Sequence, residues 1–493
     1  MKTHLFCRLL SVSLALLMLL SAAVTLTACG ESKTEIETSL EDLAEPERAA
    51  ELIRRFAKAD EASTGGVAVM DATITMRVNN LDMTVTIKSE TRHSEKDGQL
   101  REYNSVDTTV SAPSAKINER VRSYEGYMDG FMFYMNGKAR LYSELSQEDY
   151  RAWSKDRHAA SGSDIMDAVT LAASSSTRTC TEDETSYTVT LSGLDQAALG
   201  AMDSLTKSLQ ELDSGVRMTD ATITAVLDKT TYLASSIEVS PVFTTDTANA
   251  TVPTMTCTCT ITDWNNATVE TVDPTTLTKC DDLRLLYALK DQYDAMDEAL
   301  TGSYKGTFKN VVEIAGQTQS TEETDEATFS RQDGELTFTI NAKMNKDTYV
   351  ITYIDGKQTI NVNGKNNGYE VKSQATAEAY LTGQYDPLSF DLSMVESMSR
   401  DQDGSFTITF NNNALKSYKE VYEQSGYTFL NGSGSVTVTL KENGRLDSCV
   451  YHIALRYSIT QGIHTFIGTQ VVDTTLEFGD YVLPDTATDV ETN

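Results

Sequence analysis

The amino-acid sequence predicts an α+β protein with two tandem domains, each an antiparallel sheet covered by helices. Apolar and polar residues alternate with a period of two through much of the 493-residue chain, as in the run from Ile74 to Val78, which is typical of strands with one buried face. Apolar residues recur at helical spacing in a few separate stretches. The same short sequence patterns also occur twice along the chain, in the same order. Because a sheet with one apolar face must be covered, the helices are the expected cover.

The first 28 residues have the layout of a secretory signal peptide. Lys2 and Arg8 precede an apolar run over residues 9–20, and small residues lead to Ala28. The segment ends in Leu26-Thr-Ala-Cys29-Gly, which resembles the lipobox of bacterial lipoproteins. The resemblance implies cleavage before Cys29 and attachment of fatty acyl chains, such as palmitate, to its thiol. An ordinary cleaved signal and an uncleaved transmembrane anchor are the alternatives.

Residues 29–45 are polar and acidic, and they predict a flexible tether. The first domain is expected over residues 46–275. It opens with a helix from Pro46 to Ala62, in which proline suits the first turn. Further helical stretches are expected at residues 144–173 and 194–212. The strands include two hairpins, because Asp-Gly at position 129 and Asn-Gly at position 136 favour type I′ turns, which need positive φ at both central residues.

The second domain is expected over residues 276–486, with a tail over residues 487–493. Its elements repeat those of the first domain in the same order. A helix begins near Leu283, and Asp355-Gly356 and Asn363-Gly364 repeat the two turns. Helical stretches recur at residues 374–398, broken at Pro387, and at residues 414–424. Chance similarity between two threonine-rich segments is the alternative explanation of the repeat.

This order of elements resembles the lipoprotein-carrier fold of the LolA/LolB and LppX/LprG-like families. Two successive copies of this order of elements cover almost all of residues 46–486. The resemblance rests on the order of the elements and on short strand–turn–strand segments. It implies that each sheet is a curved, half-open barrel whose concave face is capped by helices, with an apolar cavity that holds acyl chains. The duplication and the strong acidity of this chain depart from the family pattern.

The sequence contains no motif that indicates catalysis, a cofactor or a metal site. Its histidines are scattered, with no His pair at helical i, i+4 spacing, and no G-x-S-x-G, Walker A or G-x-G-x-x-G motif is present. The net charge of −31 argues against a nucleic-acid partner. We therefore expect a protein that is not an enzyme and that needs no cofactor or metal.

The five cysteines beyond the lipobox do not indicate a disulfide framework. Cys257 and Cys259 alternate along a predicted strand and are expected to act as small buried hydrophobic residues. A disulfide between one of them and Cys180 is the sharper alternative. The pairing of the whole set stays open at this point: Cys180, Cys257, Cys259, Cys280 and Cys449.

Aromatic residues and methionines gather at the two corresponding hairpins. Such residues line adaptable apolar sites, although they also form ordinary sheet cores. The candidate ligand-lining residues are Tyr127, Met128, Phe131, Phe133 and Met135 in the first hairpin, and Tyr353, Ile360 and Val362 in the second.

Together these features predict a lipoprotein anchored through acylated Cys29 to the extracytoplasmic face of a bacterial membrane. Its sheet-and-helix cavities would bind an apolar or amphiphilic, lipid-like ligand by burial of apolar surface. The alternative is a cell-surface interaction or sensor module with filled barrels, which binds another surface protein or a wall polymer.

Overall fold

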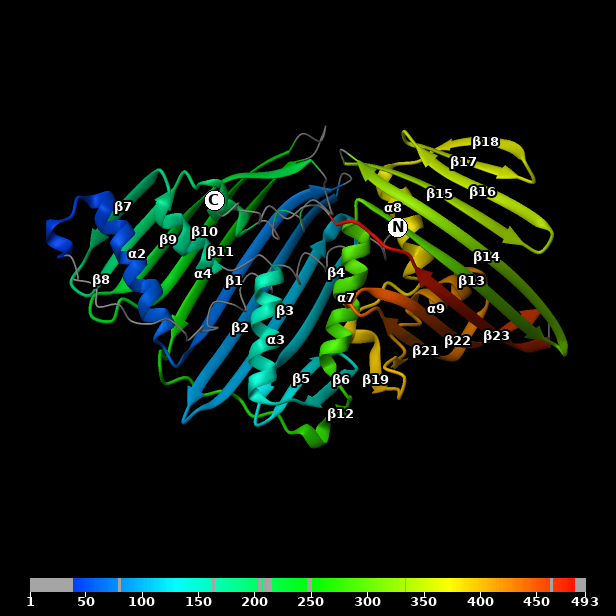
Figure 1. Cartoon of the computed structure of the whole chain (residues 1–493), viewed down its shortest axis with the longest axis horizontal. Coiled ribbons are helices and arrows are strands. Elements are labelled where there is room, and N and C mark those ends of the chain that lie inside the picture. Colours follow the sequence, from blue (N-terminus) through cyan, green and yellow to red (C-terminus); the bar gives the residue numbers. More distant parts are fainter. Residues whose placement is uncertain are drawn as a thin grey trace. The chain divides into compact units, whose positions relative to one another are not determined.

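The structure is a computed structural model that describes residues 39–78, 81–161, 165–202, 206, 209, 215–245, 251–332, 334–461 and 464–483 (Figure 1). The predicted signal peptide, the lipidation residue Cys29 and the predicted tail lie outside the described residues, as does most of the tether. The chain falls into two compact units. The first unit comprises the residues up to Gly137 together with Glu144–Asp273, and the second comprises Lys138–Ser143 together with the residues from Pro274 onward.

The first unit is built on one antiparallel sheet with short helices. Its strands are hydrogen-bonded in the order β5-β4-β3-β2-β1-β11-β10-β9-β8-β7. The strands are β1 (Gly65–Val78), β2 (Leu81–Lys96), β3 (Gln99–Ala112), β4 (Ile117–Met128), β5 (Phe131–Asn136), β7 (Thr177–Glu182), β8 (Ser186–Ser192), β9 (Val216–Asp228), β10 (Ala234–Thr245) and β11 (Thr251–Thr262). The helices are α2 (Glu45–Glu61), α3 (Gln147–Ser161), α4 (Ile165–Leu171) and α5 (Gln196–Gly200).

The second unit has the same plan. Its sheet has the order β18-β17-β16-β15-β14-β13-β23-β22-β21-β20-β19. The strands are β13 (Thr301–Ile314), β14 (Gln317–Gln332), β15 (Glu335–Met344), β16 (Asp347–Ile354), β17 (Lys357–Val362), β18 (Lys365–Val371), β19 (Val395–Arg400), β20 (Phe406–Phe410), β21 (Thr428–Leu440), β22 (Leu446–Gln461) and β23 (His464–Phe478). The helices are α7 (Leu283–Glu298), α8 (Gln374–Tyr385) and α9 (Lys416–Gln424).

Two further strands pair in parallel, β6 (Ala139–Glu144) and β12 (Thr278–Lys279). Most of β6 is counted with the second unit, although it comes from the middle of the first half of the chain. The backbone N–H of Cys280 donates to the carbonyl of Tyr142 at 2.7 Å. The N–H of Leu283, at the start of α7, donates to the hydroxyl of Ser143 at 3.2 Å. These bonds attach β6 to the start of the second unit.

The strand order of the two sheets matches strand for strand from β5 to β7 and from β17 to β19. The register matches as well: Gly66, His93, Glu102 and Tyr127 lie side by side on β1 to β4. The corresponding row on β13 to β16 is Gly302, Phe329, Phe338 and Tyr353. Both sheets are curved and neither strand order closes on itself (Figure 1). The α+β class is thus confirmed, while the half-open barrel with a cavity stays a prediction.

The covering helices are positioned by equivalent contacts. The side-chain amide of Gln147, at the start of α3, donates to the carbonyl of Gly98 at 3.1 Å. Gln374, at the start of α8, donates in the same way to Gly334 at 2.8 Å. Each glycine lies in the turn that joins the corresponding strands, β2 to β3 and β14 to β15. The two helices are therefore fixed to the same turn of the same hairpin.

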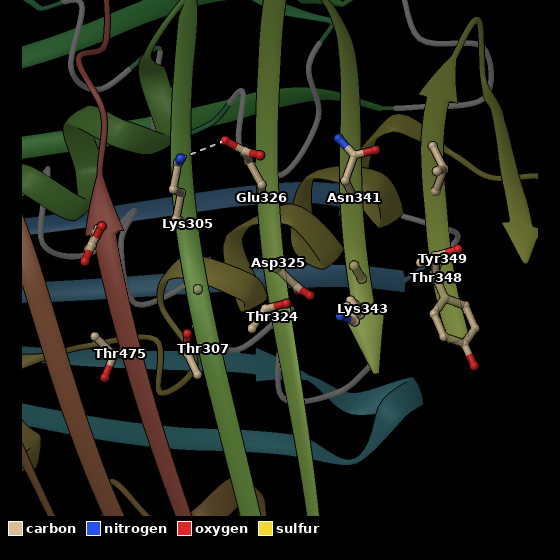
Figure 2. Close-up of a pocket in the computed structure, with 14 residues that line it drawn as sticks. Lys305, Thr307, Thr324, Asp325, Glu326, Asn341, Lys343, Thr348, Tyr349 and Thr475 are labelled. Carbon is tan, nitrogen blue, oxygen red and sulfur yellow. Dashed lines mark ion pairs between the residues drawn. The ribbon is translucent and has the colours of Figure 1, made fainter. Parts of the chain in front are cut away.

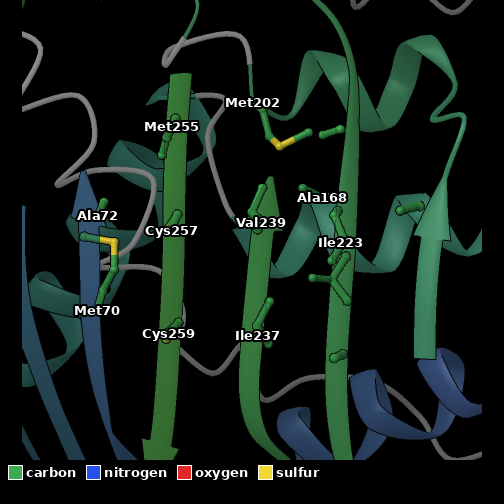
Figure 3. Close-up of a cluster of buried hydrophobic side chains, with 14 of the residues drawn as sticks. Met70, Ala72, Ala168, Met202, Ile223, Ile237, Val239, Met255, Cys257 and Cys259 are labelled. Atoms are coloured by element: carbon green, nitrogen blue, oxygen red, sulfur yellow. The ribbon is translucent and has the colours of Figure 1, made fainter. Parts of the chain in front are cut away.

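The apolar core of the first unit lies between its sheet and its helices (Figure 3). Leu52, Ile53 and Phe56 of α2 are fully buried, and they form the apolar face of the helix expected at residues 46–62. They belong to one cluster with the inward side chains of the strands, among them Ile223 and Ile237. We call this face of the sheet its inner face, and the opposite face its outer face.

Two expected helices are shorter than the pattern indicates. The stretch at residues 374–398 forms a helix only to Tyr385, where the expected break at Pro387 follows, and its last part belongs to the strand β19 (Val395–Arg400) instead of a second helical piece. Of the stretch at residues 194–212, a helix is described at Gln196–Gly200, and several later residues lie outside the described part. Within the described ranges, no helix combines the length and apolar character that a membrane crossing needs.

Candidate functional site

The candidate residues of the first hairpin lie on both faces of the sheet. Tyr127 pairs with Glu102 and Met132 and points to the inner face, whereas Phe131 pairs with Met128 and points to the outer face. Phe133 and Met135 alternate with Met132 and therefore share the outer face with Phe131. One cavity cannot be lined by all five residues, because the sheet separates them.

The outer-face aromatic residues are covered by the segment that follows β11. The backbone N–H of Val272 approaches the Met128 sulfur at 3.1 Å. Phe133 is fully buried, and its ring lies 6.0 Å from that of Tyr103. These contacts describe an ordinary core between the sheet and a crossing segment.

The candidate residues of the second hairpin share one face. Tyr353 lies on the inner face of the second sheet, with its ring 5.6 Å from that of Phe338, which in turn lies 6.1 Å from Tyr380 of α8. Ile360 pairs with Ile351 one row further along the same face, and Val362 follows by alternation. Ile360 is 37% exposed, and Ile351 and Val362 are partly exposed. We call these three residues the inner strip.

The first unit holds a buried polar cluster at the corresponding end of its inner face. We define this polar cluster as His93, Glu102, Asn104 and Tyr150. His93 and Glu102 are opposite each other on β2 and β3, with Nδ1 and Oε2 4.0 Å apart. The Asn104 side-chain amide donates to Glu102 Oε1 at 3.0 Å. Tyr150 of α3 covers the cluster and stacks on Tyr127 at 4.5 Å.

Burial controls the ionisation of this cluster. Desolvation raises the pKa of Glu102 to about 7, with a further upward contribution from the charge of Glu125. Desolvation also lowers the pKa of His93 to about 4. Burial disfavours the charged form of each group. Both side chains are therefore uncharged between about pH 4 and pH 7.

Three polar atoms of the cluster have no hydrogen-bond partner in the described protein. They are both ring nitrogens of His93 and Oδ1 of Asn104. His93 is 4% exposed and Asn104 is 5% exposed, so bulk water does not reach them. Most buried polar atoms in folded proteins have a partner, and these three therefore mark a place where a further polar group belongs.

A separate hollow of about 570 Å³ lies on the outer face of the second sheet (Figure 2). Two adjacent cross-strand rows of polar side chains cross it, and Lys305 forms an ion pair with Glu326 at 3.0 Å. One row is Glu477, Lys305, Glu326 and Asn341, and the other is Thr475, Thr307, Thr324, Lys343 and Thr348. The hollow is polar, and it contains none of the predicted ligand-lining residues.

The cysteines of the described ranges are free thiols. Cys180 lies on β7, and Cys257 and Cys259 lie on β11, with β8, β9 and β10 between them. At a strand spacing of about 4.8 Å, these four steps separate the strands by roughly 19 Å, whereas a disulfide needs Cα atoms within about 7 Å. The alternative of a disulfide with Cys180 is therefore wrong. Across the described ranges, no cluster of three His, Cys, Asp or Glu residues suits a metal ion.

Sequence reasoning missed the polar cluster. His93, Glu102 and Asn104 occupy inward positions of strands whose other inward residues include Ile87 and Val106. A signal was present on β3, because Glu102 and Asn104 interrupt the apolar alternation between Leu100 and Val106. His93 gives no such signal, because the inward residues before it on β2, Ser89 and Thr91, are already polar. The register that brings the three together is not visible from the separate strands, and neither is the helix that buries them.

No family model matches the chain, and no curated protein matches it. Among solved structures, LprF from Mycobacterium bovis is 12% identical, with 47% of this chain and 99% of that chain covered and a TM-score of 0.26. A DUF1329 family protein from Desulfovibrio piger is 9% identical, with 42% of this chain and 95% of that chain covered and a TM-score of 0.15. At these values the chain shares with each of them a partial structural likeness, which carries no argument about ligands.

Proposed function

We propose that the protein is a non-enzymatic lipoprotein, anchored through acylated Cys29 on the extracytoplasmic face of a bacterial membrane, that binds an apolar or amphiphilic lipid-like ligand. Its proposed ligand lies against the inner faces of the sheets, beneath or beside the helices. The lipobox-like sequence supports the anchor. A long acyl chain supplies enough apolar surface for binding without a catalytic group, at about 0.8 kcal/mol per buried CH₂.

The observation that carries the proposal is the inner strip. Ile351, Ile360 and Val362 continue the apolar inner face of the second sheet beyond the part that α8 buries, and they keep part of their surface exposed. Soluble proteins normally bury such continuous apolar surface, and where it stays exposed it commonly marks a binding site. An acyl chain matches the strip, because it is long, narrow and apolar.

The test uses the chain from Gly30 to Asn493, which retains every described residue. After gentle purification, native mass spectrometry and lipid extraction should find lipid at one or two molecules per chain. The variant Ile360→Glu should lower the lipid content, because it places a charge on the inner strip. Ile354→Glu is the matched control, since Ile354 is 51% exposed on the other face of the neighbouring strand. A lipid-free protein that takes up no added fatty acid or phospholipid would contradict the proposal.

A second candidate function is supported by the polar hollow. Its threonine, asparagine and paired charged side chains suit hydrogen bonding to a hydroxyl-rich wall polymer. Exposed Ile354 and Tyr369 lie further along β16 and β18 of the same sheet, and an exposed aromatic ring is a suitable platform for a sugar. Co-sedimentation with insoluble cell-wall polysaccharide tests this function. Asn341→Ala together with Thr324→Ala should reduce binding, and unchanged co-sedimentation would count against it.

A further inference from the structure

The unpartnered atoms of the polar cluster imply a missing polar partner. Removing a donor or acceptor from water without a partner costs about 1–3 kcal/mol for each group. His93 and Asn104 present three such atoms within one buried cluster. A fold that gained nothing from these side chains would be more stable with apolar residues in their place.

The second unit shows that the fold itself does not need the cluster. The residues at the corresponding register positions are Phe329 for His93, Phe338 for Glu102 and Ile340 for Asn104. All three are buried and apolar. The same strand order and the same covering-helix contact are therefore compatible with an apolar core at this place. The polar side chains are a specific feature of the first unit.

The cluster adjoins apolar rows on the same inner face. Ile87 and Val106 lie one or two rows away on β2 and β3, and both belong to the buried apolar core of the first unit. The inner face therefore changes from apolar to polar along its length. This is the pattern of an amphiphile, whose chain and head differ in the same way.

The chemistry of the cluster favours an uncharged hydroxyl group. Asn104 Oδ1 requires a donor, and neutral His93 offers one donor and one acceptor. Glu102 lies beside them, and the charge of Glu125 acts on it, so an anionic head would meet carboxylates. Two arginines of α3 have partners outside the cluster, Arg151 with Glu95 at 2.5 Å and Arg157 over the ring of Trp153, and their charges also act on His93 and on Tyr150. A hydroxyl group both donates and accepts without charge.

We propose that the polar cluster binds the uncharged, hydroxyl-bearing head of a lipid. This inference rests on the proposed lipid-binding function and names the class of lipid for the first unit. A head of this kind would pair Asn104 and His93 by hydrogen bonds.

The test compares two lipids with the same acyl chain, a monoacylglycerol and a fatty acid, on the chain from Gly30 to Asn493 at pH 8. Native mass spectrometry should show that the monoacylglycerol binds about tenfold more tightly, which corresponds to about 1.4 kcal/mol. The variants His93→Phe and Asn104→Ile introduce the residues of the second unit. Each should fold with wild-type circular dichroism and lose this preference. Glu322→Gln is the control, because Glu322 is exposed on β14, outside the inner strip and the polar cluster, and this variant should keep the preference.

The outcomes separate the two proposals. If the wild-type chain binds lipids but does not distinguish the two heads, the head-group inference is overturned and the lipid-binding function stands. The same holds if His93→Phe and Asn104→Ile keep the preference, in which case ordered water fills the cluster. If the wild-type chain takes up neither lipid, the proposed function itself fails.

Discussion

At the scale of single residues, Glu102 links the stability of the first unit to pH. Burial raises its pKa from 4.5 to about 7, so the folded protein holds this proton more tightly than the unfolded chain does. The resulting stabilisation is present at low pH and is lost as the pH rises from about 4.5 through about 7. The rise of the pKa by about 2.5 corresponds to a change of roughly 3 kcal/mol in the free energy of unfolding. His93 acts in the opposite direction, because its lowered pKa costs stability below about pH 6.5.

We therefore expect Glu102→Gln to stabilise the protein more at pH 8 than at pH 6, by about 1 kcal/mol. Glutamine keeps the shape of the side chain and removes the charge that must form in the core at high pH. Urea unfolding at the two pH values measures the difference. Glu322→Gln, on an exposed position of β14, should show no such pH dependence. An equal effect of Glu102→Gln at both pH values would show that Glu102 ionises normally.

The cysteines give a second prediction at this scale. Burial raises the pKa of Cys257, Cys259 and Cys449 to about 12 and that of Cys280 to about 11. Only the thiolate reacts readily, and Cys180 is the partly exposed thiol of the described set. A thiol reagent at pH 8 should therefore label Cys180 alone in the folded chain from Gly30. All five cysteines should be labelled after unfolding without a reductant, and a deficit of two labels would reveal a disulfide.

At the scale of elements, the hairpins were the most predictable part of the fold. Asp129 and Gly130 both have positive φ, as do Asp355 and Gly356, and the strands that flank each pair form hairpins. Such a turn depends on the conformations of two adjacent residues, so local sequence is sufficient to predict it. The turn expected at Asn136 and Gly137 lies one residue later, at Gly137 and Lys138, because Asn136 is the last residue of β5 and does not have positive φ. The division of the first candidate set between two faces could also have been predicted from the sequence. Tyr127 and Met128 are neighbours on one strand, and neighbouring side chains of a strand point to opposite faces.

Substitutions at two glycines of the first hairpin region test two different effects, backbone strain at Gly130 and steric clash at Gly126. Gly130 has a φ of 89° and open space where a Cβ would lie, whereas a Cβ on Gly126 would lie 2.1 Å from the carbonyl oxygen of Glu102. Gly130→Ala should cost about 1 kcal/mol of unfolding free energy, because alanine disfavours positive φ. Gly126→Ala should cost at least about 2 kcal/mol, because β3 and β4 must move apart. Equal losses in chemical denaturation would contradict this register of β3 and β4.

At the scale of the whole molecule, the repeat in the sequence corresponds to two sheets with the same strand order. Short sequence patterns predicted the repeat, because the same turn residues and the same alternation of apolar and polar residues recur in both halves of the chain. They could not predict the place of β6, whose bonds to Cys280 and Leu283 join residues far apart in the sequence. Nor could they predict the polar cluster, which needs the register of two strands and the position of α3.

The place of β6 predicts that the second unit depends on the first half of the chain. A fragment that begins at Pro274 lacks β6, and so it leaves β12 and the start of α7 without these hydrogen-bond partners. We expect this fragment to unfold at a lower temperature than the second unit does within the full chain. Calorimetry of the fragment and of the chain from Gly30 measures the difference. Equal melting temperatures would show that β6 contributes nothing to the second unit.

The same strand sets an order on biosynthesis. Ser143 is synthesised 140 residues before its partner Leu283, and at about 5–20 residues per second this interval is roughly 7–28 s. During that time β6 exists without β12 or α7, and the edge of β6 that does not pair with β5 is free to pair with other nascent strands. A factor that holds the chain extended until the start of the second half has been made would therefore favour correct assembly. A pause in synthesis shortly after Ser143 would instead prolong the period in which mispairing can occur.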